Sequence, residues 1–339
     1  MYSEKPLLHQ RQKACRPGQL RTIALDVTSK CNMTCPKCYA ETFVDKDPLP
    51  EDILIRTLDE FYELGVFHYV LQGGEASMVP KRLEIILRNC HPDETYINII
   101  SNGWGITKRK VQSLKSLKVD KIAFSLDSGI EQEHDEGRMQ GSFNWVMRAI
   151  DTVLEEGLLS SISTVVTHES LYSEGFNLAL EFARDRQIRI DVQIAEPVGK
   201  WDGRRDILIT SEDSAYIKKL QQDMGRLANG QMMISRDIYT GSADHCPAAT
   251  EFMSLSIDGE LLACNFLQFS LGNVHDYTVA NMRKAIMQSP WFDGEHPNCI
   301  IGEDHRFIEQ FVDPYVGKEK PLDAYEVFDI PRPSTRVGR

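Results

Sequence analysis

An alternation of strand-like and helix-like segments runs through roughly the first 200 residues of this 339-residue chain. Runs with alternating or β-branched apolar residues predict strands, and runs with apolar residues every three or four positions predict helices. Alternation at this spacing predicts a parallel sheet, open or closed into a barrel. The predicted strands span residues 21–27, 67–72, 95–101, 120–127, 158–167 and 188–199, and the predicted helices between them span residues 49–65, 81–90, 108–118, 143–157 and 175–187.

The order of elements changes after Thr210, and we expect a boundary near residues 205–240. A predicted helix at 211–228 precedes a predicted hairpin at 252–264, whose turn holds Asp258-Gly259, a strong two-residue hairpin signal. A further helix is predicted at 278–288. We therefore expect a loose polar N-terminal arm (1–20), an α/β partial barrel (21–205), a linker helix region (206–240), a small C-terminal α+β domain (241–313) and a poorly packed tail (314–339).

The composition limits the classes of partner. The chain has 38 basic and 50 acidic residues, and this net charge of −12 argues against a nucleic-acid partner. No stretch approaches the about 20 apolar residues of a membrane span, and the N-terminus lacks the order of a signal peptide. We expect a cytoplasmic protein that binds neither nucleic acid nor membrane, with its eight cysteines as metal ligands or free thiols.

Three cysteines stand close together just after the first predicted strand. Cys31, Cys35 and Cys38 form a Cys-x3-Cys-x2-Cys pattern at the strand end where parallel α/β folds keep their sites. Thiolates hold iron–sulfur clusters, and three ligands on a four-iron cube leave one iron open to another group. Zinc is the alternative, but it uses four closely spaced ligands, and the next histidine is His68. The triplet therefore predicts a [4Fe–4S] cluster.

The triplet resembles the signature of the radical S-adenosylmethionine (SAM) superfamily, and the resemblance runs over most of the chain. One departure is Lys37, because relatives often have an aromatic residue before the third cysteine; Tyr39 follows the triplet, as is common. The resemblance implies a partial (β/α)6 barrel, similar to a TIM barrel, and a cluster that chelates SAM. It also implies reductive cleavage of SAM to a 5′-deoxyadenosyl radical, chemistry that the cofactor carries.

The resemblance implies where SAM binds. The second predicted strand runs into Gly73-Gly74-Glu75, which resembles the GGE motif of the family. The glycines would let the backbone approach closely, and the carboxylate of Glu75 would meet the SAM ammonium group. The next residue, usually proline, is Ala76 here, and a plain strand–helix turn is the alternative.

Polar residues at later strand ends complete the implied SAM site. Arg138 lies in the stretch 134–143, which resembles others in this branch, and its guanidinium group fits a carboxylate partner; a surface salt bridge is the alternative. Glu196 closes the sixth strand and is expected near SAM or substrate. The contacts expected at the third and fourth strand ends come from Ser101, Asn102, Ser125 and Asp127, with loop capping an equal alternative.

Cys246, Cys264 and Cys299 remain in the C-terminal part. The predicted hairpin and the helix after it resemble the SPASM and twitch appendages of radical SAM enzymes, which bind auxiliary [4Fe–4S] clusters. The full SPASM pattern includes a Cys-x2-Cys-x5-Cys run that is missing here, so we expect one auxiliary cluster, as in the twitch form. Its fourth ligand would be His296, His305, a carboxylate or the substrate, and structural thiols are the alternative.

The resemblance also implies a class of substrate. Twitch-type relatives oxidise or rearrange small polar molecules, and only 20 residues precede the predicted barrel, so no leader-peptide domain is expected. We therefore expect an oxidoreductase-type enzyme that oxidises, epimerises or rearranges a sugar- or aminocyclitol-like small molecule, with electrons from a flavodoxin or ferredoxin. Radical modification of a ribosomal peptide or protein is the alternative among enzymes. A non-catalytic iron–sulfur or zinc protein is the alternative from another class.

Overall fold

The computed structural model describes residues 3–236, 245–294 and 296–334. A sheet of 11 strands passes through them in the order β11-β10-β9-β8-β1-β2-β3-β4-β5-β6-β7. Strands β1 to β7 are parallel to their neighbours, which confirms the predicted parallel α/β partial barrel. These strands are β1 (Thr22–Thr28), β2 (His68–Gly73), β3 (Tyr96–Ser101), β4 (Lys121–Ser125), β5 (Leu159–Val166), β6 (Arg189–Ile194) and β7 (Ile234–Ser235).

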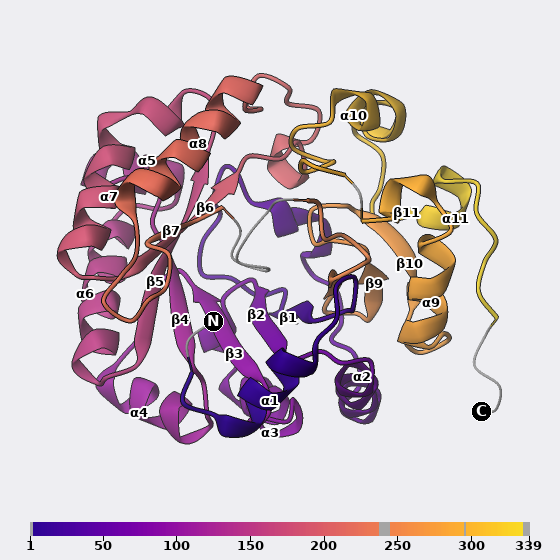
Figure 1. The fold of residues 1–339 in the computed structure, drawn as a ribbon, viewed down its shortest axis with the longest axis horizontal. Coiled ribbons are helices and arrows are strands. Elements are labelled where there is room, and N and C mark those ends of the chain that lie inside the picture. The colour runs from indigo at the N-terminus through magenta and orange to yellow at the C-terminus, as the bar shows by residue number, and fades with distance from the viewer. Residues whose placement is uncertain (1–2, 237–244, 295, 335–339) are drawn as a thin grey trace.

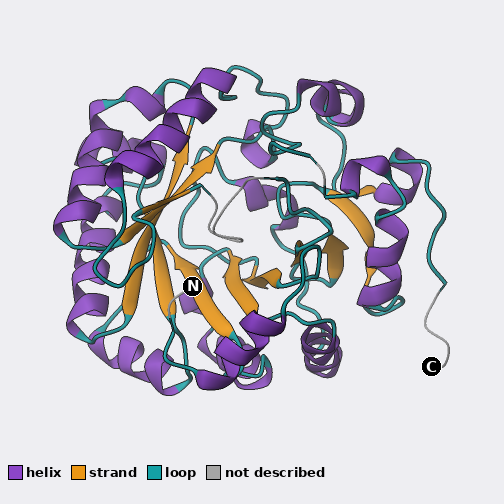
Figure 2. Ribbon diagram, viewed as in Figure 1, coloured by secondary structure: helices purple, strands orange, loops and turns teal. Residues whose placement is uncertain are grey.

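Helices cover the outer face of this curved sheet (Figures 1 and 2). Helix α2 presents an apolar stripe to the sheet: Ile53, Leu54, Leu58 and Phe61 are buried at helical spacing. No helix among the described residues is long and apolar enough to cross a membrane. The helices of this part are α2 (Glu51–Glu63), α3 (Pro80–Asn89), α4 (Lys108–Ser116), α5 (Glu131–Gly137), α6 (Ser142–Glu155), α7 (Glu174–Asp185) and α8 (Ser211–Met224), with short 3₁₀ helices at Tyr39–Phe43, Ala76–Met78, Ser170–Tyr172 and Gly199–Trp201.

The N-terminal segment differs from the loose arm that its polar composition predicts. It contains helix α1 (Pro6–Ala14), whose Leu8 is fully buried against Phe67 and Tyr96. The ammonium group of Lys5 also forms an ion pair with Asp120 at 2.6 Å. These partners lie at the amino ends of β2 to β4, so the segment packs on the end of the barrel opposite to the cysteine loop.

The C-terminal strands continue the barrel sheet beyond β1. Strand β8 pairs with β1 in parallel, and β8 and β9 form the antiparallel hairpin that Asp258-Gly259 predicts. The predicted division between 206–240 and 241–313 falls at residues outside the described ranges. The elements of this part are β8 (Phe252–Leu255), β9 (Glu260–Leu262), β10 (Phe269–Asn273), α9 (Val279–Ile286), α10 (His305–Phe311), β11 (Leu322–Asp323) and α11 (Ala324–Val327), with 3₁₀ helices at Pro290–Phe292 and Asp313–Tyr315.

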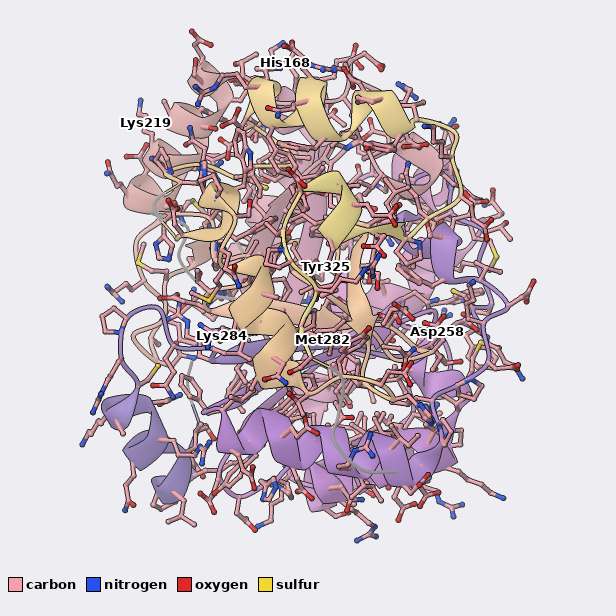
Figure 3. All side chains as sticks on the ribbon, turned by 90° about the vertical axis from the view of Figure 1, so that its right-hand side faces the viewer. His168, Lys219, Asp258, Met282, Lys284 and Tyr325 are labelled. Atoms are coloured by element: carbon pink, nitrogen blue, oxygen red, sulfur yellow. The ribbon has the colours of Figure 1, made fainter. Side chains whose placement is uncertain are left out.

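The tail after residue 313 packs more closely than its scattered prolines and charges predict. Strand β11 extends the sheet next to β10, and Tyr325 of α11 is buried. Its hydroxyl donates a hydrogen bond of 2.7 Å to the carbonyl oxygen of Leu271. Figure 3 looks onto this side of the molecule, with Tyr325 and with Met282 of α9 labelled.

Candidate functional site

A cavity of about 410 Å³ opens at the carboxyl ends of strands β1 to β6, where barrel-like α/β folds place their sites. Its walls come from the ends of these strands, from the loops after them and from the C-terminal part of the chain. Glu75 and Asp127 lie behind its wall. The sequence-predicted residues that line it are Cys31, Cys35, Cys38, Gly73, Gly74, Ser101, Asn102, Ser125, Arg138 and Glu196.

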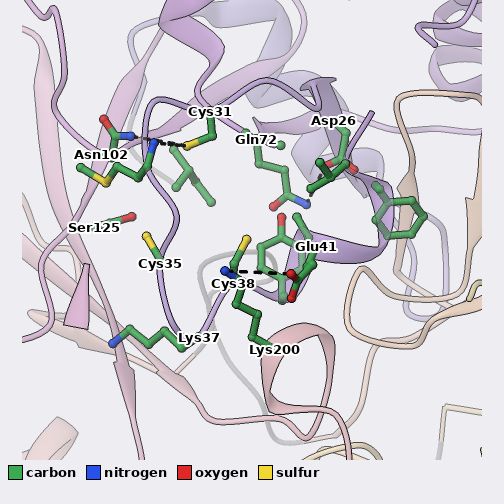
Figure 4. A pocket seen from close by; sticks show the side chains of 18 of the residues that line it. Asp26, Cys31, Cys35, Lys37, Cys38, Glu41, Gln72, Asn102, Ser125 and Lys200 are labelled. Carbon is green, nitrogen blue, oxygen red and sulfur yellow. Dashed lines mark hydrogen bonds and ion pairs between the residues drawn. The ribbon is translucent and has the colours of Figure 1, made fainter. Parts of the chain in front are cut away.

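The cysteine loop follows β1 directly, and its three sulfur atoms face the cavity (Figure 4). All three thiols are free. Cys31 Sγ accepts hydrogen bonds from the backbone N–H of Met33 at 3.4 Å and from the side-chain amide of Asn102 at 3.9 Å. Burial raises the pKa of the Cys31 and Cys38 thiols. Positive charge in the cavity would therefore favour their ionised, metal-binding form.

The donor atoms do not form a compact site for one ion. Within the described residues, no three His, Cys, Asp or Glu side chains converge closely enough to hold a single metal ion. A zinc site would need such a set at about 2 Å from the metal. Cys35 and Cys38 raise the pKa of Cys31, and Cys35 raises that of Cys38, so the three thiols lie near one another, and thiolates are the ligands of iron–sulfur clusters.

The glycines after β2 are required by the cysteine loop itself. Gly73 has φ +118°, and a Cβ there would lie 2.4 Å from the carbonyl oxygen of Thr28. A Cβ on Gly74 would lie 2.1 Å from the carbonyl oxygen of Lys30. The N–H of Gly74 donates to the Thr28 carbonyl at 2.7 Å. The close approach that only glycine permits thus fixes the chain just before Cys31.

Glu75 is 1% exposed, and its carboxylate connects two neighbouring turns. It accepts hydrogen bonds from the backbone N–H of Asn102 at 2.8 Å, the hydroxyl of Ser101 at 3.1 Å and the backbone N–H of Ser77 at 3.0 Å. Burial raises its pKa, and these hydrogen bonds oppose the rise. The structure places this carboxylate behind the cavity wall, whereas the sequence predicts that it faces SAM.

Asp127 lies in a buried charge cluster at one end of the cavity. Arg138 binds it in a bidentate manner, with Nε and Nη2 at 2.6 and 3.2 Å from its two oxygens, and Lys37 Nζ lies 2.9 Å from it. Burial alone would raise the pKa of Asp127, but the two cations hold it well below its ordinary value. Arg138 also interacts with the Cys35 thiol. The salt bridge predicted as the alternative for Arg138 is therefore present, and it is buried.

Two acid–amide pairs line the cavity, and among their four residues the sequence singles out Glu196 alone. Asp26 accepts a 3.3 Å hydrogen bond from Gln72, and Glu196 accepts one of 2.6 Å from Gln193. Burial raises the pKa of Asp26 to about 7; the bond from Gln72 lowers it, and the nearby Asp258 raises it. The sequence signal for Asp26 is an acidic residue within an apolar strand, and this signal does not tell which face of the sheet the side chain takes.

The three C-terminal cysteines lie close enough to affect one another. Burial raises the pKa of Cys264 and Cys299 well above the ordinary value, and Cys246 and Glu196 raise both further. Glu196 also lines the cavity that the first three cysteines face, so one carboxylate borders that cavity and affects the second set of cysteines. Cys299 donates its backbone N–H to Glu303 at 2.9 Å.

The candidates for the fourth ligand of the auxiliary cluster differ in their surroundings in the structure. The ring of His296 stacks on Trp291, with centroids 5.3 Å apart, and His305 is exposed at the start of α10. Among the carboxylates, Glu303 is already paired with Arg236. Glu196 combines a place on the cavity wall with an effect on Cys264 and Cys299.

Comparison with known proteins identifies relatives over most of the chain. A model described as the radical SAM superfamily matches residues 25–176. An AdoMet-dependent heme synthase from Nitratidesulfovibrio vulgaris is 24% identical over 336 residues, which cover 91% of this chain and 86% of the relative. A PqqA peptide cyclase from Ruegeria pomeroyi is 22% identical over 300 residues, which cover 85% and 78% of the two chains.

Solved structures share the fold. Streptococcus suis SuiB bound to its precursor peptide SuiA matches with a TM-score of 0.62 at 16% identity, over 84% of this chain and 70% of SuiB. The protein anSMEcpe with bound AdoMet and a Cp18Cys peptide matches with a TM-score of 0.58 at 17% identity, over 80% and 81% of the two chains.

Proposed function

We propose that this chain, which belongs to the radical SAM superfamily, modifies the side chain of a peptide or protein. The observation that carries this proposal is the agreement between relatives and structural neighbours. PqqA peptide cyclases match over most of their length, and the two neighbouring structures described above were solved with peptides bound. The relatives named above favour this alternative over the sugar- or aminocyclitol-like substrate that the sequence favours.

The cysteine loop is assigned to the [4Fe–4S] cluster of this enzyme, with Cys31, Cys35 and Cys38 as ligands. Three protein ligands would leave one iron open to SAM, and the chemistry that such a cluster would supply is reductive cleavage of the S–C5′ bond to a 5′-deoxyadenosyl radical. The chain's own part is to place SAM against the substrate and to keep water away from the radical. A flavodoxin- or ferredoxin-type partner would supply the electron.

The SAM contacts are assigned to the cavity wall beside the cysteine loop. Backbone groups of Gly73 and Gly74 and polar groups of Ser101, Asn102 and Ser125 face this space. Arg138 lines the same space, and Asp127 holds its guanidinium group by two hydrogen bonds. Glu75 acts as a positioning residue, because its carboxylate fixes the turn that carries Ser101 and Asn102.

Cys246, Cys264 and Cys299 are assigned to one auxiliary [4Fe–4S] cluster, with Glu196 as a carboxylate that lines the cavity and also raises the pKa of Cys264 and Cys299. A cluster there would lie next to the cavity. It would accept an electron from a substrate radical or position the substrate. The oxidoreductase-type reaction expected from the sequence depends on the first of these roles.

The heme synthase relatives give a second candidate. They match 76% to 91% of this chain, so a reaction on a precursor of heme is the competing substrate class. The two candidates differ in size and chemistry, and a direct assay therefore separates them.

The test uses reconstituted holoenzyme with SAM and dithionite under anaerobic conditions. Three substrate pools are compared: short synthetic peptides, heme precursors, and sugars with aminocyclitols. Mass spectrometry follows 5′-deoxyadenosine and any change in substrate mass. We expect a mass change coupled to 5′-deoxyadenosine release in the peptide pool. A coupled change confined to another pool would contradict the proposal and identify the competing class.

A further inference from the structure

Asp26 is a buried carboxyl group that none of the assignments above uses. It lies on β1 and is 6% exposed, and its side chain lines the cavity (Figure 4). In the parallel register of β1 and β2 it stands opposite Gln72, whose amide donates the 3.3 Å hydrogen bond described above. Asp26 is therefore held in place by the sheet and is open to a ligand in the cavity.

The charge on Asp26 has no partner of opposite sign. No Lys, Arg or His side chain forms an ion pair with it within residues 3–236, 245–294 and 296–334. Asp127, at another part of the same site, is compensated by both Arg138 and Lys37. A buried carboxylate with one long hydrogen bond is costly until a cation pairs with it. The pKa of about 7 reflects this cost.

The apolar wall of the cavity suits the stem of a long basic side chain. Phe43, Ile257 and Phe266 line the same space as Asp26. Lysine and arginine side chains bury their methylene groups against such surfaces while the charged end finds a polar partner. A site of this composition favours a basic side chain over a small hydrophilic molecule.

We propose that Asp26 binds a positively charged side chain of the substrate, the ammonium group of a lysine or the guanidinium group of an arginine. This proposal rests on the proposed function, because a peptide or protein supplies such side chains. SAM carries an ammonium and a sulfonium group, so the same chemistry has a second source, and the experiment must separate the two.

The experiment measures binding to SAM-loaded holoenzyme by titration calorimetry. The probes are N-acetyl-lysine methylamide and its norleucine counterpart, which have similar stems but differ in charge. We expect the parent protein to bind the lysine probe several-fold more tightly, since the ion pair forms in a buried site. Asp26→Asn, which keeps the shape of the side chain, should remove that preference and leave the SAM dissociation constant within twofold of the parent value.

Glu41→Gln is the matched control, because Glu41 is an exposed acid that lines the same cavity. This variant should keep the preference for lysine. Asp26→Ala serves as the second variant if the asparagine variant does not fold, as judged by circular dichroism.

Three results would overturn the proposal. The parent protein could bind both probes equally, or the preference for lysine could survive Asp26→Asn. Alternatively, Asp26→Asn could lower the affinity for SAM instead of the preference for lysine. The last result would assign Asp26 to SAM. Because the assay measures binding, its outcome is separate from that of the turnover test. Peptides that bind with a lysine preference but are never modified would count against the proposed function alone.

Discussion

Glu75 accepts a hydrogen bond of 2.8 Å from the backbone N–H of Asn102, whose side-chain amide in turn donates to Cys31 Sγ at 3.9 Å. Three segments far apart in sequence thus meet in one chain of contacts: the turn after β2, the end of β3 and the cysteine loop. The position of Cys31 therefore depends on a carboxylate that does not itself line the cavity.

Replacement of Glu75 by Ala should lower the free energy of unfolding by about 1.5–3 kcal/mol, the range for hydrogen bonds to a charged group. SAM affinity should fall as well, because Ser101 and Asn102 lose the group that holds their turn. Urea denaturation and a SAM titration check the two effects. Glu41→Ala removes an exposed acid from the same cavity and should change neither. Unchanged stability of Glu75→Ala would contradict the positioning role.

Replacement of Arg138 by Ala should cost about 3–5 kcal/mol of stability, because it leaves Asp127 buried with one cation fewer. Asp127 keeps Lys37 as its second partner in this variant, so Lys37→Met and Asp127→Asn together, added to Arg138→Ala, should recover much of that loss by removing the other two buried charges. Chemical denaturation of the single and triple variants measures both. A triple variant no more stable than Arg138→Ala would show that the buried charges are not the source of the cost.

Replacement of Asp26 by Asn should stabilise the protein more at pH 8 than near pH 5. The pKa of Asp26 is about 7 in the folded protein against an ordinary 3.8, so the folded state holds its proton longer than the unfolded chain. Stability is therefore lost as the pH rises from about 4 to 7, by roughly 4 kcal/mol at most, because a difference of one in pKa corresponds to about 1.36 kcal/mol. The asparagine variant lacks this loss. Denaturation midpoints of both proteins at the two pH values test it, and an equal gain at both would refute the raised pKa.

Replacement of Cys31, Cys35 and Cys38 together by Ala should leave a folded protein that releases no 5′-deoxyadenosine from SAM. All three thiolates are needed to hold the cluster with its open iron. Circular dichroism checks the fold and chromatography measures the nucleoside. Release at the parent rate would mean that the ligands lie elsewhere.

Replacement of Cys246 and Cys264 by Ala should remove roughly half of the iron, because four of about eight irons belong to the second cluster. Substrate turnover should fall far more than half, while the electron paramagnetic resonance signal of the SAM-binding cluster persists. Iron analysis, spectroscopy and product assays measure the three effects. Full iron content would identify these cysteines as structural thiols, and full turnover with half the iron would limit the second cluster to bracing the fold.

The barrel strands could be predicted because β1 to β6 are buried runs separated by helices with clear apolar spacing. Helix α1 could not, because Leu8 is its one buried residue and finds its partners in Phe67 and Tyr96, far along the chain. Its stability comes from tertiary contacts, which local patterns do not contain.

Site residues that belong to a sequence motif could be predicted. Site residues whose side-chain direction depends on strand pairing or on tertiary contacts could not. The cysteine loop and Gly73-Gly74 line the cavity as their spacing predicts. Asp26 sits in the apolar run ALDV, whose pattern does not tell which face of the sheet its side chain takes, and the structure places it on the cavity wall opposite Gln72. Glu75 belongs to a recognisable motif, yet its carboxylate turns toward Asn102, a direction that spacing does not encode.

The parallel pairing of β8 with β1 has a consequence for the integrity of the molecule. Four residue pairs, from Thr22 with Phe252 to Leu25 with Leu255, cover one side of the strand that leads into the cysteine loop. Without the C-terminal strands, β1 would present a row of unsatisfied backbone groups, and such an exposed edge invites pairing between molecules. A fragment ending at residue 236 should therefore aggregate. The C-terminal strands therefore also prevent self-association of the barrel sheet through β1.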